Sequence, residues 1–282
     1  MQASSNKKRY TVKHYKNRFI DIGTPKRIWA VAAIHGDIDR LAKIHDAIYE
    51  HIHAGDRLIY LGNYTGHGAH SKEVVNELLS FRRCTLAKQA MIPSDIIYLR
   101  GMQEEMHQKL LQLQFTSDPL GTYLWMLGNG LSNTLTSYGL SPHDGVEACH
   151  QGTIGIAQWT ARFKKAIDKH AGHQKFTTQY YRAAYTSKNT NIPATLFVNA
   201  GINTNHEIED QDDGFWWDYE MFDTMDKPYA PFSRIIRGYD PFHRGAKIED
   251  IKATIDAGAG FGGNLICACF DTTGAYLDSI EF

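Results

Sequence analysis

Histidine, carboxylate and amide side chains recur at five places where an apolar run gives way to a polar loop. The five stretches are AAIHG (32–36), GNYTGHG (62–68), GMQE (101–104), NAG (199–201) and RGYDP (237–241). Side chains of these types can hold metal ions or transfer protons. The chemistry that is possible therefore depends on how many such groups these loops bring together.

The elements that would position these loops alternate over the first hundred residues. RIWAVAAI, DRLIYLG and SDIIYLRG are typical of strands, and DIDRLAKIHDAIYEHI and SKEVVNELLSFRR are typical of helices. In the first helix Leu41, Ile44 and Ile48 fall on one face, and Asp37 takes the N-cap position. The pattern predicts a βαβαβ unit with its polar loops after the strands.

The rest of the chain divides into a helical part and a second group of strands. Residues 105 to about 190 favour helices, most clearly QWTARFKKAIDKHAG. Strands are then predicted in ATLFVNAG, SRIIRGYD, TIDAGAG, NLICACFD and AYLDSIEF. We therefore predict an N-terminal arm over residues 1–24 and one α/β domain over residues 25–282, with a helical insert at about 105–190.

Composition narrows the classes of function. The chain has 30 Lys and Arg against 31 Asp and Glu, and 43% of its residues are hydrophobic, which is ample for a core. The balanced charge gives no general attraction to nucleic acid. No apolar run approaches the roughly 20 residues of a membrane span, and the start lacks the apolar core of a secretion signal. We expect a cytoplasmic protein without a nucleic-acid partner or a membrane span.

In their order and spacing, the five stretches resemble the bacterial serine/threonine protein phosphatase group within the calcineurin-like metallophosphoesterases. At these places the group has Gly-Asp-x-His-Gly, Gly-Asp-x-x-Asp-Arg-Gly, Gly-Asn-His-Glu, His-Ala-Gly and His-Gly-His-x-Pro. WMLGNGLSNTLTSYG (125–139) and DAGAGFGGNL (256–265) are similar to two further stretches, so the resemblance covers nearly the whole chain. It implies a four-layer α/β/β/α sandwich with a helical cap, whose loops surround a two-metal cleft.

The resemblance also implies that most of the metal ligands have been replaced. The two aspartates correspond to Ala33 and Asn63, and the histidine that acts as the acid corresponds to Gln103. Only His35 remains as an ordinary metal ligand. The altered cleft that the resemblance defines consists of His35, Asn63, His67, Met102, Gln103, Glu104, Asn199, Arg237 and Tyr239.

Charge decides whether such a cleft could hold two metal ions. Two divalent cations about 4 Å apart repel by roughly 17 kcal/mol at an effective dielectric constant of about 20, and carboxylates normally offset that repulsion. Here a methyl group and a neutral amide replace the carboxylates, and Arg237 adds a positive charge. We expect no catalytic residue and no cofactor; an active protein would need Mn, Fe or Zn.

Three functions remain open at this point. The first is a pseudophosphatase, a phosphatase-like scaffold or binding module without catalysis. The second is an active phosphoesterase with one metal near His35, Asp37 and Asn63, although Asp37 also suits a helix N-cap. The third is a sensor that binds phosphate esters or nucleotides through His67 and Arg237, although a buried arginine more often pairs with a carboxylate.

The sequence also suggests which side chains stabilise the cleft and which segments could bind a partner. Asp218 and Asp240 are the partners expected for Arg237, and Glu104 is expected to hold a loop by accepting backbone hydrogen bonds. A partner, if there is one, is expected to be another protein. It would bind the helical insert, which ends in QYYRAAY (179–185), or the aromatic segment GFWWDYEMF (214–222).

Overall fold

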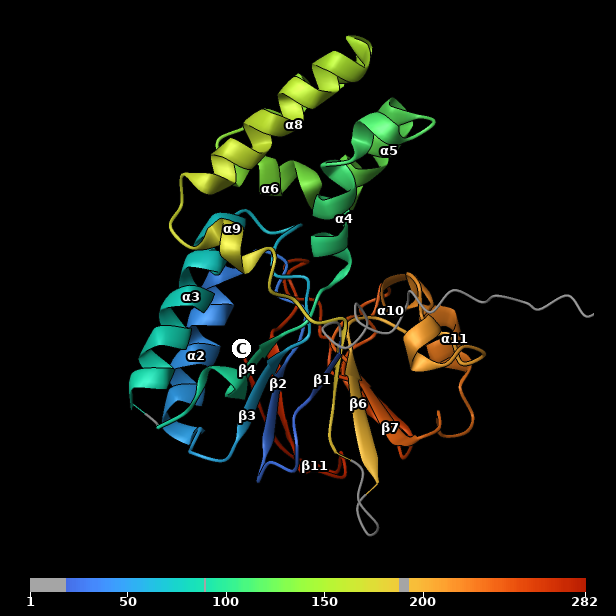
Figure 1. The fold of residues 1–282 in the computed structure, drawn as a ribbon. Helices are drawn as coiled ribbons and strands as arrows, with labels where there is room; N and C mark the ends of the chain where they lie inside the picture. The colour runs from blue at the N-terminus through green and yellow to red at the C-terminus, as the bar shows by residue number, and fades with distance from the viewer. Residues whose placement is uncertain (1–18, 89, 188–192) are drawn as a thin grey trace, which may run out of the picture.

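The computed structural model describes residues 19–88, 90–187 and 193–282 and contains two central sheets (Figure 1). The first sheet has the strand order β11-β10-β2-β3-β4. Strands β2, β3 and β4 are parallel and are joined through α2 (Ile38–His51) and α3 (Ser71–Lys88), which confirms the βαβαβ prediction. The strands are β2 (Ile28–Val31), β3 (Arg57–Tyr60), β4 (Ile96–Tyr98), β10 (Ile266–Phe270) and β11 (Tyr276–Glu281).

The second sheet has the order β1-β5-β6-β7-β9-β8. Its strands are β1 (Phe19–Asp21), β5 (Ala183–Tyr185), β6 (Ala194–Val198), β7 (Phe232–Arg237), β8 (Lys247–Ile248) and β9 (Lys252–Thr254). β9 ends where the predicted strand TIDAGAG begins, so that prediction was wrong. Gly258 and Gly260 have φ angles of 82° and 80°, which a regular strand does not accommodate.

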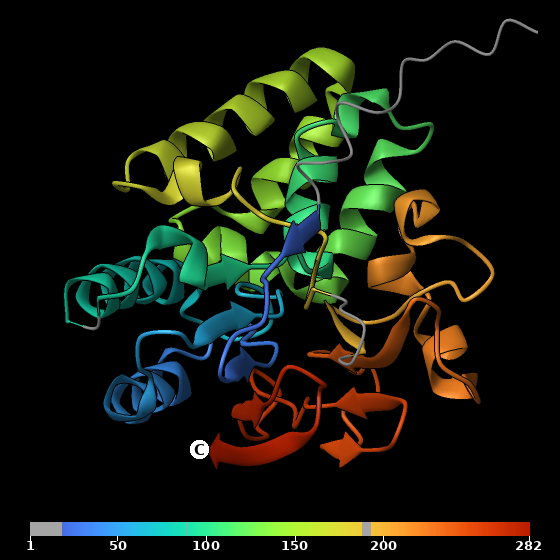
Figure 2. The ribbon, with the colours of Figure 1, turned by 60° about the horizontal axis from the view of Figure 1, so that its bottom comes forward.

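Helices cover the outer faces of both sheets. α2 and α3 lie on one side, and α10 (Gly214–Trp217) and α11 (Tyr219–Thr224) lie on the other (Figures 1 and 2). This is the four-layer α/β/β/α sandwich that the resemblance implied. Strands buried on both faces explain why the sequence shows unbroken apolar runs instead of alternation.

A helical cap stands above the carboxyl ends of the strands (Figure 1). Its helices pack around Met106, Leu110, Tyr123, Trp159 and Phe163, so the cap has apolar contacts of its own. None of the described helices is long and apolar enough to cross a membrane. The cap helices are α4 (Met102–Leu110), α5 (Pro119–Met126), α6 (Ser132–Ser137), α7 (Pro142–His150), α8 (Gly152–Asp168) and α9 (His173–Phe176).

Two short strands lie inside the predicted arm and the predicted insert, and β8 is a third strand that the sequence does not predict. β5 falls inside the insert expected at 105–190, and β1 falls inside the arm expected at 1–24; residues 1–18 of that arm lie outside the described residues. The two strands pair with each other in parallel, and β5 also pairs with β6. Three-residue strands carry too little periodicity to be recognised from sequence. The domain boundaries themselves stay a prediction.

Buried histidines make the stability of the cap depend on pH. Burial lowers the pKa of His107 to about 4, and burial with a smaller contribution from His170 lowers the pKa of His173 to about 4. The unfolded chain therefore binds more protons than the folded protein between about pH 6.5 and 4. Acidification through this window should lower the free energy of unfolding by about 1.4 kcal/mol per pH unit for each of these histidines.

The variant His107→Leu tests this pH dependence. Urea unfolding at several pH values should show a slope shallower by about 1 kcal/mol per pH unit than that of the unchanged protein. His143 has a 74% exposed side chain, so His143→Gln is the matched control and should leave the slope unchanged. Equal slopes for all three proteins would contradict the assignment of a neutral, buried His107.

Candidate functional site

The carboxylate of Glu104 holds together the loops that follow β3 and β4. It is 3% exposed and accepts hydrogen bonds from the backbone N–H groups of Asn63 (2.8 Å), Tyr64 (3.0 Å) and Gly101 (2.9 Å). Burial raises the pKa of Glu104, although the three N–H groups oppose that shift. The expectation that Glu104 holds a loop is confirmed, and its oxygens face backbone donors.

Asn63 and Asn199 direct their side-chain oxygens to the first turn of α4. Oδ1 of Asn63 accepts from the N–H of Gln103, and Oδ1 of Asn199 accepts from the N–H of Met102, both at 3.1 Å. The N-terminus of a helix has unpaired N–H groups and a partial positive charge, so it binds such oxygens well. At these two positions, where the resemblance implies metal ligands, the amide oxygens therefore already accept hydrogen bonds from the protein's own backbone.

His35 is fully buried among other rings. It follows β2 with a φ angle of 49°, and its ring centroid lies 5.3 Å from that of His67, 5.1 Å from Tyr239 and 5.2 Å from Phe261. Burial lowers the pKa of His35 well below its usual value, and the positive character of His67 and His243 adds to this effect. His35 is therefore a neutral side chain at physiological pH.

Several polar atoms around His35 have no hydrogen-bond partner among the described residues. They include both ring nitrogens of His35, Nδ2 of Asn63, Oγ1 of Thr65 and Oε1 of Gln103. Gly66 keeps this region open, because a Cβ atom there would lie 3.0 Å from both Gln103 Oε1 and His35 Nδ1. These groups offer donors and acceptors without charge, so they suit neutral hydrogen-bonding species better than divalent ions.

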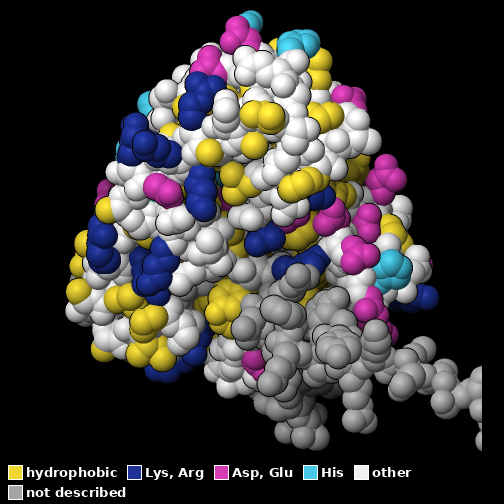
Figure 3. Space-filling model, turned by 45° about the horizontal axis from the view of Figure 1, so that its top comes forward, with side chains coloured by type: hydrophobic (Ala, Val, Ile, Leu, Met, Phe, Trp, Pro, Cys, Tyr) yellow, Lys and Arg dark blue, Asp and Glu magenta, His cyan; other side chains and the backbone are white. Residues whose placement is uncertain are grey.

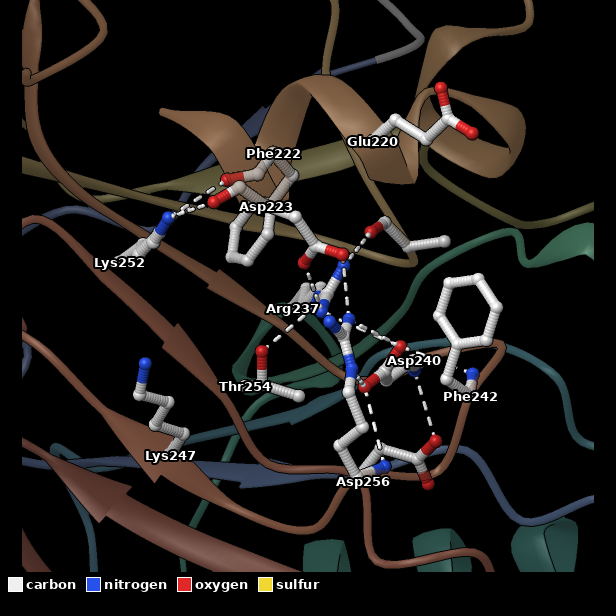
Figure 4. Close-up of polar contacts among 12 residues, drawn as sticks. Glu220, Phe222, Asp223, Arg237, Asp240, Phe242, Lys247, Lys252, Thr254 and Asp256 are labelled. Atoms are coloured by element: carbon white, nitrogen blue, oxygen red, sulfur yellow. Dashed lines mark hydrogen bonds and ion pairs between the residues drawn. The ribbon is translucent and has the colours of Figure 1, made fainter. Parts of the chain in front are cut away.

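Arg237 forms the centre of a buried ionic network (Figure 4). The side chain is 2% exposed; Nε donates to Thr254 Oγ1 at 2.9 Å, and a terminal nitrogen donates to Asp223 Oδ1 at 2.8 Å. The same nitrogen lies 3.6 Å from Asp240 Oδ1, and the guanidinium lies over the ring of Phe222 at 4.3 Å. Burial lowers the pKa of Arg237, and the two carboxylates oppose that shift.

Asp223 is the main partner of Arg237, which the sequence reasoning missed. Asp240 was expected, but Asp218 forms no ion pair with Arg237 in the described part of the chain. Asp223 belongs to α11 and to none of the five motif stretches, so only its spacing on an amphipathic helix could have identified it. Arg244 closes the network, because its guanidinium reaches Asp240 at 2.7 Å and Asp223 at 2.6 Å.

The other expected residues are placed as follows. Gln103 donates from Nε2 to the carbonyl of Asn129 at 2.7 Å, and Met102 is buried in the cap core. Ala33 belongs to the same apolar cluster. Asp37 accepts from the N–H of Arg40 and forms an ion pair with its side chain at 2.7 Å, so it caps α2 as predicted. Asp37 thus serves the helix, and the structure gives it no contact with His35.

His67 and Arg237 do not present two free positive charges. The ring of His67 lies against that of Phe261, with centroids 4.2 Å apart and planes tilted by 39°. Burial, with a smaller contribution from the nearby His243, lowers the pKa of His67. Arg237 has its donors directed at Asp223, Thr254 and the carbonyl of Ala200. An anion would therefore have to compete with carboxylates that already neutralise Arg237.

These residues do not fit a two-metal centre. Within the described ranges, no group of three or more His, Cys, Asp or Glu side chains could hold a metal ion. Around His35, the polar atoms without a partner belong to amides and a hydroxyl, and the nearby ring of His67 lies against Phe261. The resemblance places Met102 at a metal-ligand position, where a thioether cannot replace an oxygen ligand. Hard and borderline divalent ions require anionic oxygens or several imidazoles instead.

Comparison with known proteins supports the fold. No protein-family model matches this chain, and no curated protein sequence does. A protein named as a candidate diadenosine tetraphosphatase is 16% identical, with a TM-score of 0.53 over 94% of this chain and 98% of its own. A cold-active protein tyrosine phosphatase is 10% identical, with a TM-score of 0.52 over 92% of this chain and 80% of its own. At such identities the likeness shows the fold alone, an α/β/β/α sandwich of the phosphoesterase type.

The Arg237 network predicts a large energetic coupling. Arg237→Ala removes the buried cation beside Asp240 and the 25% exposed Asp223 and leaves only Arg244 to pair with them, so it should cost about 2–3 kcal/mol of unfolding free energy. Combining it with Asp223→Ala should cost less than the sum of the single changes, with a coupling of about 1–3 kcal/mol measured by urea unfolding.

A pair of surface residues provides the control for this double-mutant cycle. Arg162 and Asp144 are 59% and 43% exposed and 3.7 Å apart, and their coupling should stay below about 1 kcal/mol. Additive costs for Arg237 and Asp223 would show that the buried network does not hold this part of the fold together.

Proposed function

We propose that this protein is a pseudophosphatase: a phosphoesterase fold used as a scaffold or binding module, without hydrolytic turnover. One observation carries the proposal. The guanidinium of Arg237 lies buried and paired with Asp223 at a position where the resembled family has a metal-binding histidine. A guanidinium has no lone pair to offer a divalent ion, so this position supplies no metal ligand.

The remaining side chains also lack the groups for the reaction. A two-metal phosphoesterase needs carboxylates that balance the ions, a metal-activated hydroxide and an acid for the leaving oxygen. Ala33 and Asn63 provide no carboxylate. Gln103 cannot donate a proton as an acid does, and its amide nitrogen is already bonded to the Asn129 carbonyl.

Two alternatives receive less support. A single metal centred on His35 would need Asp37, which is bound to Arg40 at the start of α2. A phosphate-ester or nucleotide sensor would need free positive charge on His67 and Arg237, which are respectively low in pKa and paired. A scaffold needs neither group, and we place its protein partner, as the sequence predicts, in the cytoplasm.

Metal content and hydrolysis test the proposal together. Full-length protein purified without chelator and incubated with Mn²⁺, Fe²⁺ or Zn²⁺ should retain well under one ion per chain by elemental analysis. EDTA should leave the Tm unchanged, since no metal contributes to folding. Neither p-nitrophenyl phosphate nor the substrates that the structural neighbours are named for, diadenosine tetraphosphate and phosphotyrosine, should be hydrolysed.

His35→Ala provides the control for contaminating activity. Trace hydrolysis that is equal in the unchanged protein and in His35→Ala comes from another enzyme and agrees with the proposal. Stoichiometric metal, together with hydrolysis that His35→Ala abolishes, would overturn the proposal and favour the single-metal alternative.

A further inference from the structure

The two regions expected to bind a partner present little continuous apolar surface. In GFWWDYEMF (214–222), Phe215, Trp216 and Phe222 are at most 2% exposed, so this segment is mainly core. Figure 3 shows the face that carries the cap, where hydrophobic side chains lie in small groups with Lys, Arg, Asp and Glu between them. A longer exposed apolar stretch lies on β11, at the opposite end of the molecule from the cap (Figure 1).

β11 is an exposed strand at the edge of the first sheet. Among the described strands it pairs with β10 alone, and Figure 2 shows it along the lower border of the molecule, beside the label C. Tyr276 and Leu277 are 44% and 51% exposed, and Phe282, which follows the strand, is 41% exposed. Native edge strands are usually short or covered, so an exposed edge of six residues with apolar side chains indicates a surface for association.

The main-chain groups of Ser279 and Glu281 point away from β10. Leu265 and Phe282 exchange two main-chain hydrogen bonds, one from the N–H of Leu265 at 2.9 Å and one from the N–H of Phe282 at 3.2 Å. Such bonded pairs alternate along an antiparallel ladder, so every second residue of β11 faces outward, Ser279 and Glu281 among them. Both residues are exposed, so another strand can reach these main-chain groups.

The sequence of β11 is complementary to itself in one antiparallel register. With a two-fold axis at Ser279, the serines of two copies face each other and exchange main-chain hydrogen bonds. Asp278 then lies opposite Ile280 of the second copy, and Glu281 lies opposite Leu277. No carboxylate of the strand faces another in this register, whereas an axis at Asp278 would oppose like charges.

A lysine beside the strand complements the charge of Asp278. Lys43 is exposed on α2, and its Nζ lies 5.9 Å from the ring centre of Phe282. Asp278 lies on the same face of the sheet, because β10 places it in register with Trp29, whose ring is beside α2. Neither charge forms an ion pair with another described side chain. In the two-fold pair, Asp278 lies diagonally across from Phe282 of the second copy, within reach of its Lys43.

Within one chain, Asp278 occupies the central donor of this edge. Its carboxylate accepts a hydrogen bond from the N–H of Ser279 at 2.8 Å. The bond joins neighbouring residues and is exposed to solvent, so exchanging it costs little. In the two-fold pair the N–H bonds to the second copy, and the carboxylate turns to Lys43 of that copy. Both groups keep a partner, so no unpaired polar group opposes association.

We propose that this protein forms a homodimer in which two copies of β11 pair antiparallel about Ser279 and join their first sheets into one. Asp278 and Lys43 form ion pairs across the interface, and the exposed apolar residues of the strand become covered. The interface contains no residue of the altered cleft, so the inference does not depend on the absence of hydrolysis. It gives a scaffold two equivalent copies of every other surface.

Sedimentation equilibrium of the full chain tests the dimer. The unchanged protein should be dimeric at micromolar concentrations. Ser279→Pro should be monomeric, because proline removes the outward N–H at the centre of the interface and is tolerated at such edge positions. Ser279→Ala keeps this N–H and is the matched control, which should remain dimeric. A monomeric unchanged protein, or a dimer that persists in folded Ser279→Pro, would overturn the proposal.

Exchange of the interface charges tests the register without altering the main chain. Asp278→Lys and Lys43→Asp should each raise the Kd of the dimer by about tenfold, because each change enters the two-fold interface twice. The double variant restores opposite charges and should return the Kd to within about threefold of the unchanged value. Lys164 is exposed on α8, so Lys164→Asp is the control and should leave the Kd unchanged.

Two results of the charge exchange would contradict this interface. The first is a double variant no tighter than the single variants, and the second is an equal effect of Lys43→Asp and Lys164→Asp. None of these results bears on metal content or hydrolysis, so the dimer and the proposed function can fail separately.

Discussion

The buried ion pair between Arg237 and Asp223 sets the electrostatics of the loops at the carboxyl ends of the strands. A guanidinium that is 2% exposed needs a compensating charge, and Asp223 and Asp240 supply two carboxylates, which Arg244 balances from the solvent side. Each charged side chain of the network is therefore paired with another side chain of this protein. Divalent ions placed nearby would find guanidinium groups, which have no lone pair to offer, and carboxylates already paired with arginine.

The loops keep their shape through the Glu104 carboxylate, two asparagine amides and the N-terminus of α4. Glu104 accepts three backbone hydrogen bonds, and Asn63 and Asn199 cap the next N–H groups of the helix. Metal ions often supply this kind of cross-link between loops; here side-chain oxygens and backbone donors provide it. A fold of this type can therefore hold these loops in place without metal ions, which is the physical basis of the scaffold role proposed above.

Sequence reasoning succeeded where patterns are long or chemically specific. The βαβαβ unit follows from runs of five or more apolar residues, and the N-cap at Asp37 and the loop-holding role of Glu104 follow from side-chain chemistry. It failed where partners are distant in sequence. β1 and β5 are three residues long, the pairing of Asp223 with Arg237 depends on where α11 packs, and the glycines after Thr254 end a strand that looked longer.

The central claim is that the loops carrying His35 and Asn63 do not hold a pair of divalent ions, and anomalous diffraction from crystals grown in excess Mn²⁺ measures this directly. The account predicts no anomalous peak beside Asn63, with the guanidinium of Arg237 in contact with Asp223 and Thr254. Two peaks about 3.5–4 Å apart beside Asn63, the spacing of two-metal hydrolases, would contradict it.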